Sequence, residues 1–161
     1  MSSEKRKIAY IDGKPYEIGP NHTSVLKFVK SYLGDKKVPT LCDDPNLAPY
    51  GACRVCSVEV ALVKDGPTKV VASCHTPVGE NQHIFTNNKN LTSLRKNIVE
   101  LVLSDHPMEC KTCEVNNNCE LQEVANDLGI SDHRYNNPKQ HKGIPKDTSH
   151  DYMRMNLDNC I

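Results

Sequence analysis

Apolar residues follow strand-like or helix-like spacing along most of the chain up to about residue 130. Residues 7–18 contain two short runs separated by Asp12-Gly13, which predicts a β-hairpin. In SVLKFVKSYLG the apolar positions recur at steps of three and four, which predicts a helix with Thr23 as its N-cap and Gly34 at its end. After the loop CDDPNLAPYGAC, three further strands are expected at residues 55–63, 68–74 and 82–86.

From residue 89 onward the apolar period becomes helical. The segment TSLRKNIVELVLSD predicts a helix capped by Thr92 or Ser93. Its expected buried face comprises Leu94, Ile98, Leu101 and Val102. The segment CELQEVANDLGI predicts a second helix, which starts at Cys119 and ends near Gly129. The polar remainder holds two prolines and has little periodicity, which is typical of a connector that crosses a surface.

The order of these elements predicts an α+β fold. Residues 1–88 are expected to form a β-grasp domain, in which one helix packs across a mixed sheet. Residues 89–129 are expected to form a small helical domain, and residues 130–161 an extended connector. The sequence contains no internal repeat and no G-x-G pattern.

Composition narrows the classes of protein. The 20 basic and 20 acidic residues give a formal net charge of zero, which excludes the overall basic excess of a nucleic-acid-binding protein. Only 37% of the residues are apolar and Trp is absent, and small domains with thin cores commonly depend on disulfides or metals. No apolar run has the length of a signal peptide or membrane span, so we expect a cytoplasmic protein. There, clustered cysteines favour metal over disulfides, which stay the alternative.

A first candidate metal site has the spacing C-x10-C-x2-C-x17-C and comprises Cys42, Cys53, Cys56 and Cys74. A plant-type [2Fe–2S] site likewise takes three cysteines from one loop and a distant fourth, although its first gap is shorter. Gly51 and Ala52 lack bulk, so the backbone N–H groups of GACRVC could approach the sulfurs.

A second candidate site has the spacing H-x3-C-x2-C-x5-C and comprises His106, Cys110, Cys113 and Cys119. Cys119 would lie at the start of a helix, where the helix dipole favours negative charge. A neutral imidazole in place of a fourth thiolate removes one negative charge. The reduction potential of a cluster held there should therefore rise, as it does in Rieske centres.

Zinc is the alternative ligand for both sets, because structural zinc sites are ordinarily built from four cysteines or from three cysteines and one histidine. For the second set, the spacing alone does not distinguish zinc from an iron–sulfur cluster. The first set favours an iron–sulfur cluster, since zinc ribbons offer two CxxC-like pairs and Cys74 has no second cysteine close by.

Together the two motifs carry a resemblance to a known family. The segments PTLCDDPNLAPYGACRVCSVEV, ASCHTPV and LVLSDHPMECKTCEVNNNCELQ resemble the N-terminal iron–sulfur region of the 75 kDa subunit of respiratory complex I, the bacterial G subunit. They are equally similar to related subunits of NAD-linked hydrogenases and NAD-dependent formate dehydrogenases. The resemblance extends over nearly the whole chain from about Lys7.

The resemblance implies a β-grasp plant-type [2Fe–2S] ferredoxin domain followed by a small helical [4Fe–4S] domain. The [2Fe–2S] ligands would be Cys42, Cys53, Cys56 and Cys74, and the [4Fe–4S] ligands His106, Cys110, Cys113 and Cys119. Where the family usually has Gly before the last of these cysteines, this chain has Asn118, a residue type that tolerates φ > 0. Cys160 resembles the first ligand of a further ferredoxin-like block, so we expect either a truncated piece or a short subunit with a plain thiol.

By this resemblance, the chain is an electron-transfer subunit or fragment of a hetero-oligomeric redox complex. It would pass single electrons between a flavin/NAD(P)H-linked partner, such as an FMN/NADH-binding subunit, and a terminal redox site in a quinone reductase, hydrogenase or formate dehydrogenase. No nucleotide, flavin or molybdenum motif is visible, so no catalytic residue is expected on this chain. A free-standing ferredoxin or redox sensor and a zinc-stabilised interaction module are the two alternatives.

Overall fold

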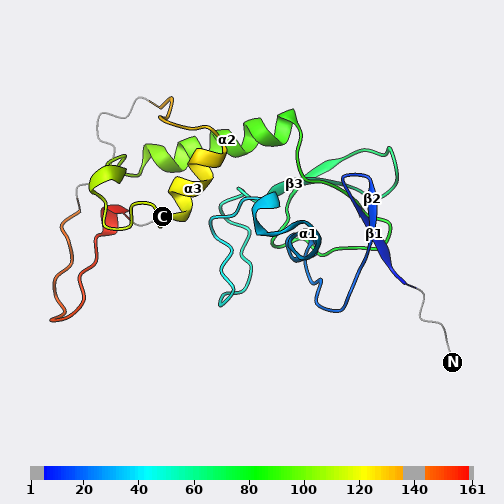
Figure 1. The fold of residues 1–161 in the computed structure, drawn as a ribbon, viewed down its shortest axis with the longest axis horizontal. Helices are drawn as coiled ribbons and strands as arrows, with labels where there is room; N and C mark the ends of the chain where they lie inside the picture. Colours follow the sequence, from blue (N-terminus) through cyan, green and yellow to red (C-terminus); the bar gives the residue numbers. More distant parts are fainter. Residues whose placement is uncertain (1–5, 136–143, 160–161) are drawn as a thin grey trace. The chain divides into compact units, whose positions relative to one another are not determined.

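The computed structural model describes residues 6–135 and 144–159 (Figure 1). The chain divides into two compact units, which comprise residues 1–95 and 96–161. Cys160, the expected start of a further ferredoxin-like block, lies outside the described residues. None of the described helices is long and apolar enough to cross a membrane.

The first unit contains a mixed five-stranded sheet. Its strands are β1 (Ile8–Ile11), β2 (Lys14–Glu17), β3 (Ser57–Ala61), β4 (Lys69–Ala72) and β5 (His83–Phe85). Their order across the sheet is β2-β1-β5-β3-β4; β1 and β5 run parallel, whereas the other three pairs are antiparallel. Every strand lies within a segment predicted as one, and each of the last three is shorter than predicted.

One helix packs on this sheet, as expected (Figure 1). Helix α1 (Val25–Leu33) precedes the short 3-10 helix η1 (Asp35–Lys37). The predicted N-cap Thr23 is wrong by one residue, because Oγ of Ser24 accepts the hydrogen bond from the N–H of Lys27 (3.2 Å). Gly34 ends the helix as predicted, with φ of 86°. The helix contributes Val25, Leu26, Phe28 and Val29 to the core.

The turn between β1 and β2 is hydrogen-bonded to Thr86, the residue that directly follows β5. Asp12 and Gly13 both have positive φ (49° and 83°), the conformation that a two-residue hairpin turn requires. The Asp12 carboxylate accepts hydrogen bonds from the N–H (2.8 Å) and hydroxyl (2.6 Å) of Thr86. It also pairs with Nζ of Lys37 (3.2 Å). One turn residue thus joins three segments of the unit.

Helix α2 (Lys89–Ser104) begins earlier than predicted. Oδ1 of Asn88 accepts a hydrogen bond from the N–H of Leu91 (2.9 Å), so Asn88 caps the first turn. The predicted caps, Thr92 and Ser93, are therefore wrong. Both lie inside the helix.

The buried face of α2 also differs from the prediction. Leu101 is 59% exposed, and the other three predicted positions, Leu94, Ile98 and Val102, are only partly buried. A four-residue step instead runs through the buried residues Leu91, Arg95, Val99 and Leu103. Arg95 breaks the apolar pattern of this face, which is why the sequence pointed to the neighbouring one.

The second unit also contains η2 (Cys110–Thr112), α3 (Glu120–Asp127) and η3 (Leu157–Asn159). Helix α3 begins directly after Cys119, as predicted, and the chain reverses at Gly129, where φ is 65°. Residues 144–159 are largely exposed, and the N–H groups of Asp147 and Met155 each donate to the carbonyl of the other (2.8 and 3.0 Å).

Asp12→Asn should lower the free energy of unfolding by about 1–2 kcal/mol at pH 7, because the bonds from Thr86 and Lys37 favour the charged form. Burial raises the pKa of Asp12, but these bonds outweigh it and hold the pKa below its ordinary 3.8. The stabilisation is therefore present above about pH 4 and lost as the pH falls through the folded-state pKa. Thermal unfolding by circular dichroism between pH 7 and 3 measures it.

Asp65→Asn is the matched control, since Asp65 is an exposed turn residue that also has positive φ (56°). Its effect should be small at every pH. A deficit of Asp12→Asn that stays unchanged below pH 3 would contradict the electrostatic explanation.

Candidate metal centres

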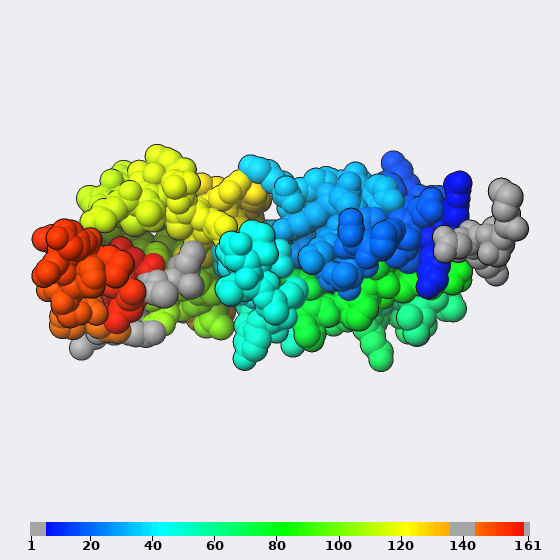
Figure 2. Space-filling model, turned by 90° about the horizontal axis from the view of Figure 1, so that it is seen from below, coloured from blue at the N-terminus to red at the C-terminus, as the bar shows by residue number. Residues whose placement is uncertain are grey.

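The first cysteine set surrounds one end of the sheet. Cys42 lies in the loop after η1, Cys53 and Cys56 lie in the turn before β3, and Cys74 follows β4. Cys56 and Cys74 are buried, at 1% and 2% exposure, whereas Cys42 and Cys53 are partly exposed. Residues 40–50, which include the first of these cysteines, form the cyan part of the surface in Figure 2.

The four thiols contact one another in two pairs. The Cys42 and Cys53 side chains affect each other's pKa, and the Cys56 side chain affects that of Cys74. Burial and then the neighbouring Cys56 raise the pKa of Cys74 to about 12, and burial also raises the pKa of Cys53. Four such groups can all become thiolates only when a positive charge compensates them. The donor set therefore fits a metal group with a positively charged core.

Backbone N–H groups lie at the sulfur of Cys42. Burial raises the pKa of Cys42, but hydrogen bonds from the Cys53 backbone, the Cys53 thiol and the Ala52 backbone outweigh it, so this pKa lies below its ordinary value. The GACRVC segment was expected to direct N–H groups at sulfur, and it does so here. Arg54 within this segment has positive φ (62°). Ser57 holds the turn, because its Oγ (2.6 Å) and its N–H (3.1 Å) both donate to the carbonyl of Arg54.

The start of α1 holds the segment that carries the last cysteine. The first N–H groups of a helix lack partners within it. Here Val25 donates to the carbonyl of Thr76 (2.8 Å), and Leu26 to that of Ser73 (2.9 Å). The buried Ser73 hydroxyl donates to the carbonyl of Cys56 (2.6 Å). The sequence does not point to Ser73, because a single serine in a strand-like run carries no pattern.

Two further contacts hold the loop of residues 40–53. Nζ of Lys30 pairs with Oδ2 of Asp43 (3.1 Å), and both side chains are about one-quarter exposed. Nδ1 of His75 lies 3.3 Å from the carbonyl of Pro49. Gly51 packs against the same histidine with φ of 71°, and a Cβ there would lie 3.3 Å from Cβ of His75. A side chain at Gly51 would therefore be strained as well as crowded.

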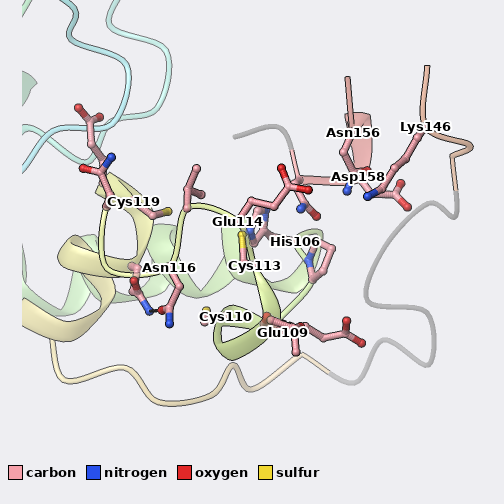
Figure 3. A pocket seen from close by; sticks show the side chains of 17 residues that line it. His106, Glu109, Cys110, Cys113, Glu114, Asn116, Cys119, Lys146, Asn156 and Asp158 are labelled. Carbon is pink, nitrogen blue, oxygen red and sulfur yellow. Dashed lines mark hydrogen bonds between the residues drawn. The ribbon is translucent and has the colours of Figure 1, made fainter. Parts of the chain in front are cut away.

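The second set lines a cavity of about 660 Å³ (Figure 3). His106 follows α2, Cys110 begins η2, Cys113 directly follows η2, and Cys119 precedes α3. The acidic side chains of Glu109, Glu114 and Asp158 also line this cavity, together with the base Lys146. The sequence-predicted donors are thus brought to one cavity of the second unit.

Within the described residues, two of these donors lack a hydrogen bond that their position would allow. Nδ1 of His106 is buried and has no hydrogen-bond partner in the described part of the chain. Burial lowers the pKa of His106, which favours the neutral imidazole that a metal needs. Cys119 is the N-cap of α3, yet its side chain makes no capping hydrogen bond. Both donors therefore fit a metal group in the cavity.

The loop before Cys119 differs from the expected shape. Asn118 stands where the family usually has a glycine and is of a residue type that tolerates positive φ, but the residue with positive φ is Asn117 (64°). Gln122 holds this loop, because its side chain accepts from the N–H of Asn117 (2.8 Å) and donates to Oδ1 of Asn116 (3.0 Å). Gln122 was not among the predicted site residues, although glutamine at the third position of a helix is a known capping signal.

The described donors are not arranged for a single ion. Among residues 6–135 and 144–159, no three His, Cys, Asp or Glu side chains come close enough to hold one metal ion. The seven cysteines within these ranges are all free of disulfides.

Both units match models of iron–sulfur proteins. Residues 8–89 match the 2Fe-2S iron-sulfur cluster binding domain, and residues 95–134 match the NADH-ubiquinone oxidoreductase-G iron-sulfur binding region, a 4Fe–4S model. The molecule is therefore an iron–sulfur protein. It belongs to the family of 2Fe-2S iron-sulfur cluster binding domains, whose model matches more than half of the chain.

Curated relatives include subunits of several oxidoreductases. The chain is 34% identical to NADPH-Fe(3+) oxidoreductase subunit alpha of Geobacter sulfurreducens over 78% of its length and 14% of that protein. It is 35% identical to NADP-reducing hydrogenase subunit HndD of Solidesulfovibrio fructosivorans over 94% of its length and 25% of that protein. It is 32% identical to the G subunit of NADH-quinone oxidoreductase of Escherichia coli over 78% of its own length and 14% of that protein. The chain thus spans a quarter or less of these relatives.

A solved structure shares the fold. A chain of NAD+-reducing [NiFe]-hydrogenase in the H2-reduced state matches 96% of this chain with a TM-score of 0.81. The match covers 62% of that chain at 24% sequence identity.

Gly51→Ala should accelerate loss of iron from the first site about tenfold, because positive φ and the contact with His75 each oppose a Cβ. Gly79→Ala is the control, since a Cβ there would have nothing within 4 Å. Transfer of iron to a chelator, followed by absorbance, measures the rate. Equal rates for the two variants would contradict the proposed role of Gly51.

Proposed function

We propose that this chain passes single electrons through two iron–sulfur clusters within a larger NAD(P)-linked oxidoreductase. The observation that carries the proposal is the pairing of two matched cluster-binding regions with two separate four-donor sets on one chain. Two clusters within one chain suit electron relay, because each accepts and releases one electron without moving a substrate.

The first set would hold the [2Fe–2S] cluster through Cys42, Cys53, Cys56 and Cys74. The pairing of Cys42 with Cys53 and of Cys56 with Cys74 supports this assignment, since each iron of such a cluster takes two protein ligands. The sheet order and the helix across it suit a β-grasp plant-type ferredoxin domain, for which we propose residues 1–88.

The second set would hold the [4Fe–4S] cluster through His106, Cys110, Cys113 and Cys119. The shared cavity and the free Nδ1 of His106 support this assignment. We propose residues 89–129 as the domain that carries it and residues 130–161 as an extended connector.

The bound clusters would supply the reversible one-electron redox step. The protein would hold them by thiolate and imidazole, keep Cys56 and Cys74 away from water, and direct N–H groups of residues 52 and 53 toward sulfur. These hydrogen bonds favour the additional negative charge of a reduced cluster. No residue of this chain is proposed to act on an organic substrate.

The proposed partners are other subunits of the complex, with an FMN/NADH-binding subunit as the electron donor. The names of the relatives support a hydrogenase or a quinone-reducing enzyme as the terminal site. A formate dehydrogenase rests on the resemblance alone. We propose a cytoplasmic location, peripheral to the membrane where the complex itself is bound to one.

Anaerobically purified protein should contain about six iron and six sulfide per chain and show two EPR signals after reduction with dithionite. Iron, sulfide and zinc analysis and EPR measure this. Stoichiometric zinc without sulfide under strict anaerobiosis would overturn the redox proposal. A stable isolated protein that co-purifies with no other subunit would instead favour a free-standing ferredoxin.

Cys113→Ser should remove the [4Fe–4S] EPR signal and leave the [2Fe–2S] signal, because the two donor sets share no residue. Cys56→Ser, its matched counterpart, should do the reverse. Loss of both signals in either variant would count against two independent sites.

His106→Cys should lower the midpoint potential of the [4Fe–4S] cluster, because a fourth thiolate adds negative charge that disfavours reduction. The [2Fe–2S] potential, measured in the same EPR redox titration, serves as the internal reference. An unchanged or raised [4Fe–4S] potential would show that the imidazole does not act through its charge.

A further inference from the structure

A buried arginine lies next to the first cysteine set. Arg95, on α2, is 4% exposed, and its Nη2 donates to the carbonyls of Ser57 (2.6 Å) and Thr86 (2.8 Å). Ser57 directly follows Cys56 in the chain and begins β3. The guanidinium is thus held by the first residue of β3 and by the residue that follows β5. The first of these, Ser57, is next to the proposed cluster ligand Cys56 in the chain.

This arginine lacks an acidic partner. Within the described residues no carboxylate pairs with Arg95, and its buried Nε has no hydrogen-bond acceptor there. A buried charge is costly unless an opposite charge compensates it. Deprotonation offers no relief, because arginine keeps its proton in proteins.

The nearest source of compensating charge is the cysteine set. Burial lowers the pKa of Arg95, and the negative charge of Cys56 is the one interaction that raises it. The attraction is mutual, so a cation that is favoured by negative sulfur in turn favours negative charge on that sulfur. Low polarisability of the buried surroundings strengthens such an interaction relative to water.

A purely structural role explains less. Two carbonyl acceptors at the ends of β3 and β5 could be satisfied by a neutral donor, at no cost of burying a charge. The position itself, between the buried residues Leu91 and Val99 on the same face of α2, is otherwise apolar. A cation at this position therefore requires a reason beyond hydrogen bonding.

We propose that Arg95 is a positioning residue that raises the reduction potential of the [2Fe–2S] cluster held by Cys42, Cys53, Cys56 and Cys74. The inference rests on the proposed function. Reduction adds one electron, supplied by a redox partner or dithionite, to the cluster; no bond to Arg95 forms or breaks, and no proton moves. The fixed positive charge stabilises the additional negative charge of the reduced state.

The test compares Arg95→Gln, which keeps N–H donors but removes the charge, with Arg95→Lys, which keeps the charge. The full chain, loaded with both clusters, is titrated with dithionite and followed by EPR. At the wild-type midpoint, Arg95→Gln should lower the ratio of reduced to oxidised [2Fe–2S] on the order of tenfold, about 59 mV for one electron. Arg95→Lys should change this ratio less than threefold, and neither variant should move the [4Fe–4S] midpoint.

Several results would overturn the proposal. One is an unchanged [2Fe–2S] midpoint in loaded Arg95→Gln, and another is an equal shift in Arg95→Lys, which would indicate packing instead of charge. If Arg95→Gln and Arg95→Met both fail to load while Arg95→Lys loads normally, the charge acts in assembly and not in tuning. Absence of a [2Fe–2S] signal in the wild-type protein would instead refute the proposed function itself.

Discussion

Compensation of negative charge is the constraint on which the first site depends. Its four thiols lie close together, and burial with the neighbouring Cys56 raises the pKa of Cys74 to about 12. Without a compensating positive charge, burial therefore disfavours the thiolate form of Cys74. The fold supplies N–H groups at Cys42 and a buried guanidinium next to Cys56. Each of these charge-compensating groups is hard to explain unless the sulfurs beside it carry negative charge.

Contacts of the surrounding fold fix the positions of these groups. The first N–H groups of α1 hold the segment of the last cysteine, and Lys30 and His75 hold the long loop from both sides. Asp12 joins the hairpin turn to Thr86, whose carbonyl accepts from Arg95. The β1–β2 hairpin therefore helps to position the Arg95 guanidinium through Thr86, without a direct bond to it. Rigid placement matters here, because reorganisation of the surroundings would cost energy at each electron transfer.

Local signals in the sequence predicted the regular elements well. The Asp12-Gly13 turn, the glycine end of α1 and the start of α3 at Cys119 each follow from residue types that the backbone conformation demands. The spacing of the second set predicted four donors that line one cavity, and the ligand roles of both sets stay predictions. The face of α2 was mispredicted, because its buried row includes a charged residue, and burial of a charge is decided by tertiary contacts that no periodicity reveals.

The same constraint suggests why the second site includes histidine. Its cavity is lined by the acids Glu109, Glu114, Glu120 and Asp158 and by Lys146, and no arginine lies among its lining residues. A fourth thiolate there would add negative charge to acidic surroundings, and reduction would add another. The neutral imidazole of His106, whose burial lowers its pKa, avoids the first of these charges. The first site would thus have four thiolates compensated by the cation of Arg95. The second site would have acidic neighbours and only three thiolates, with the neutral His106 as its fourth ligand.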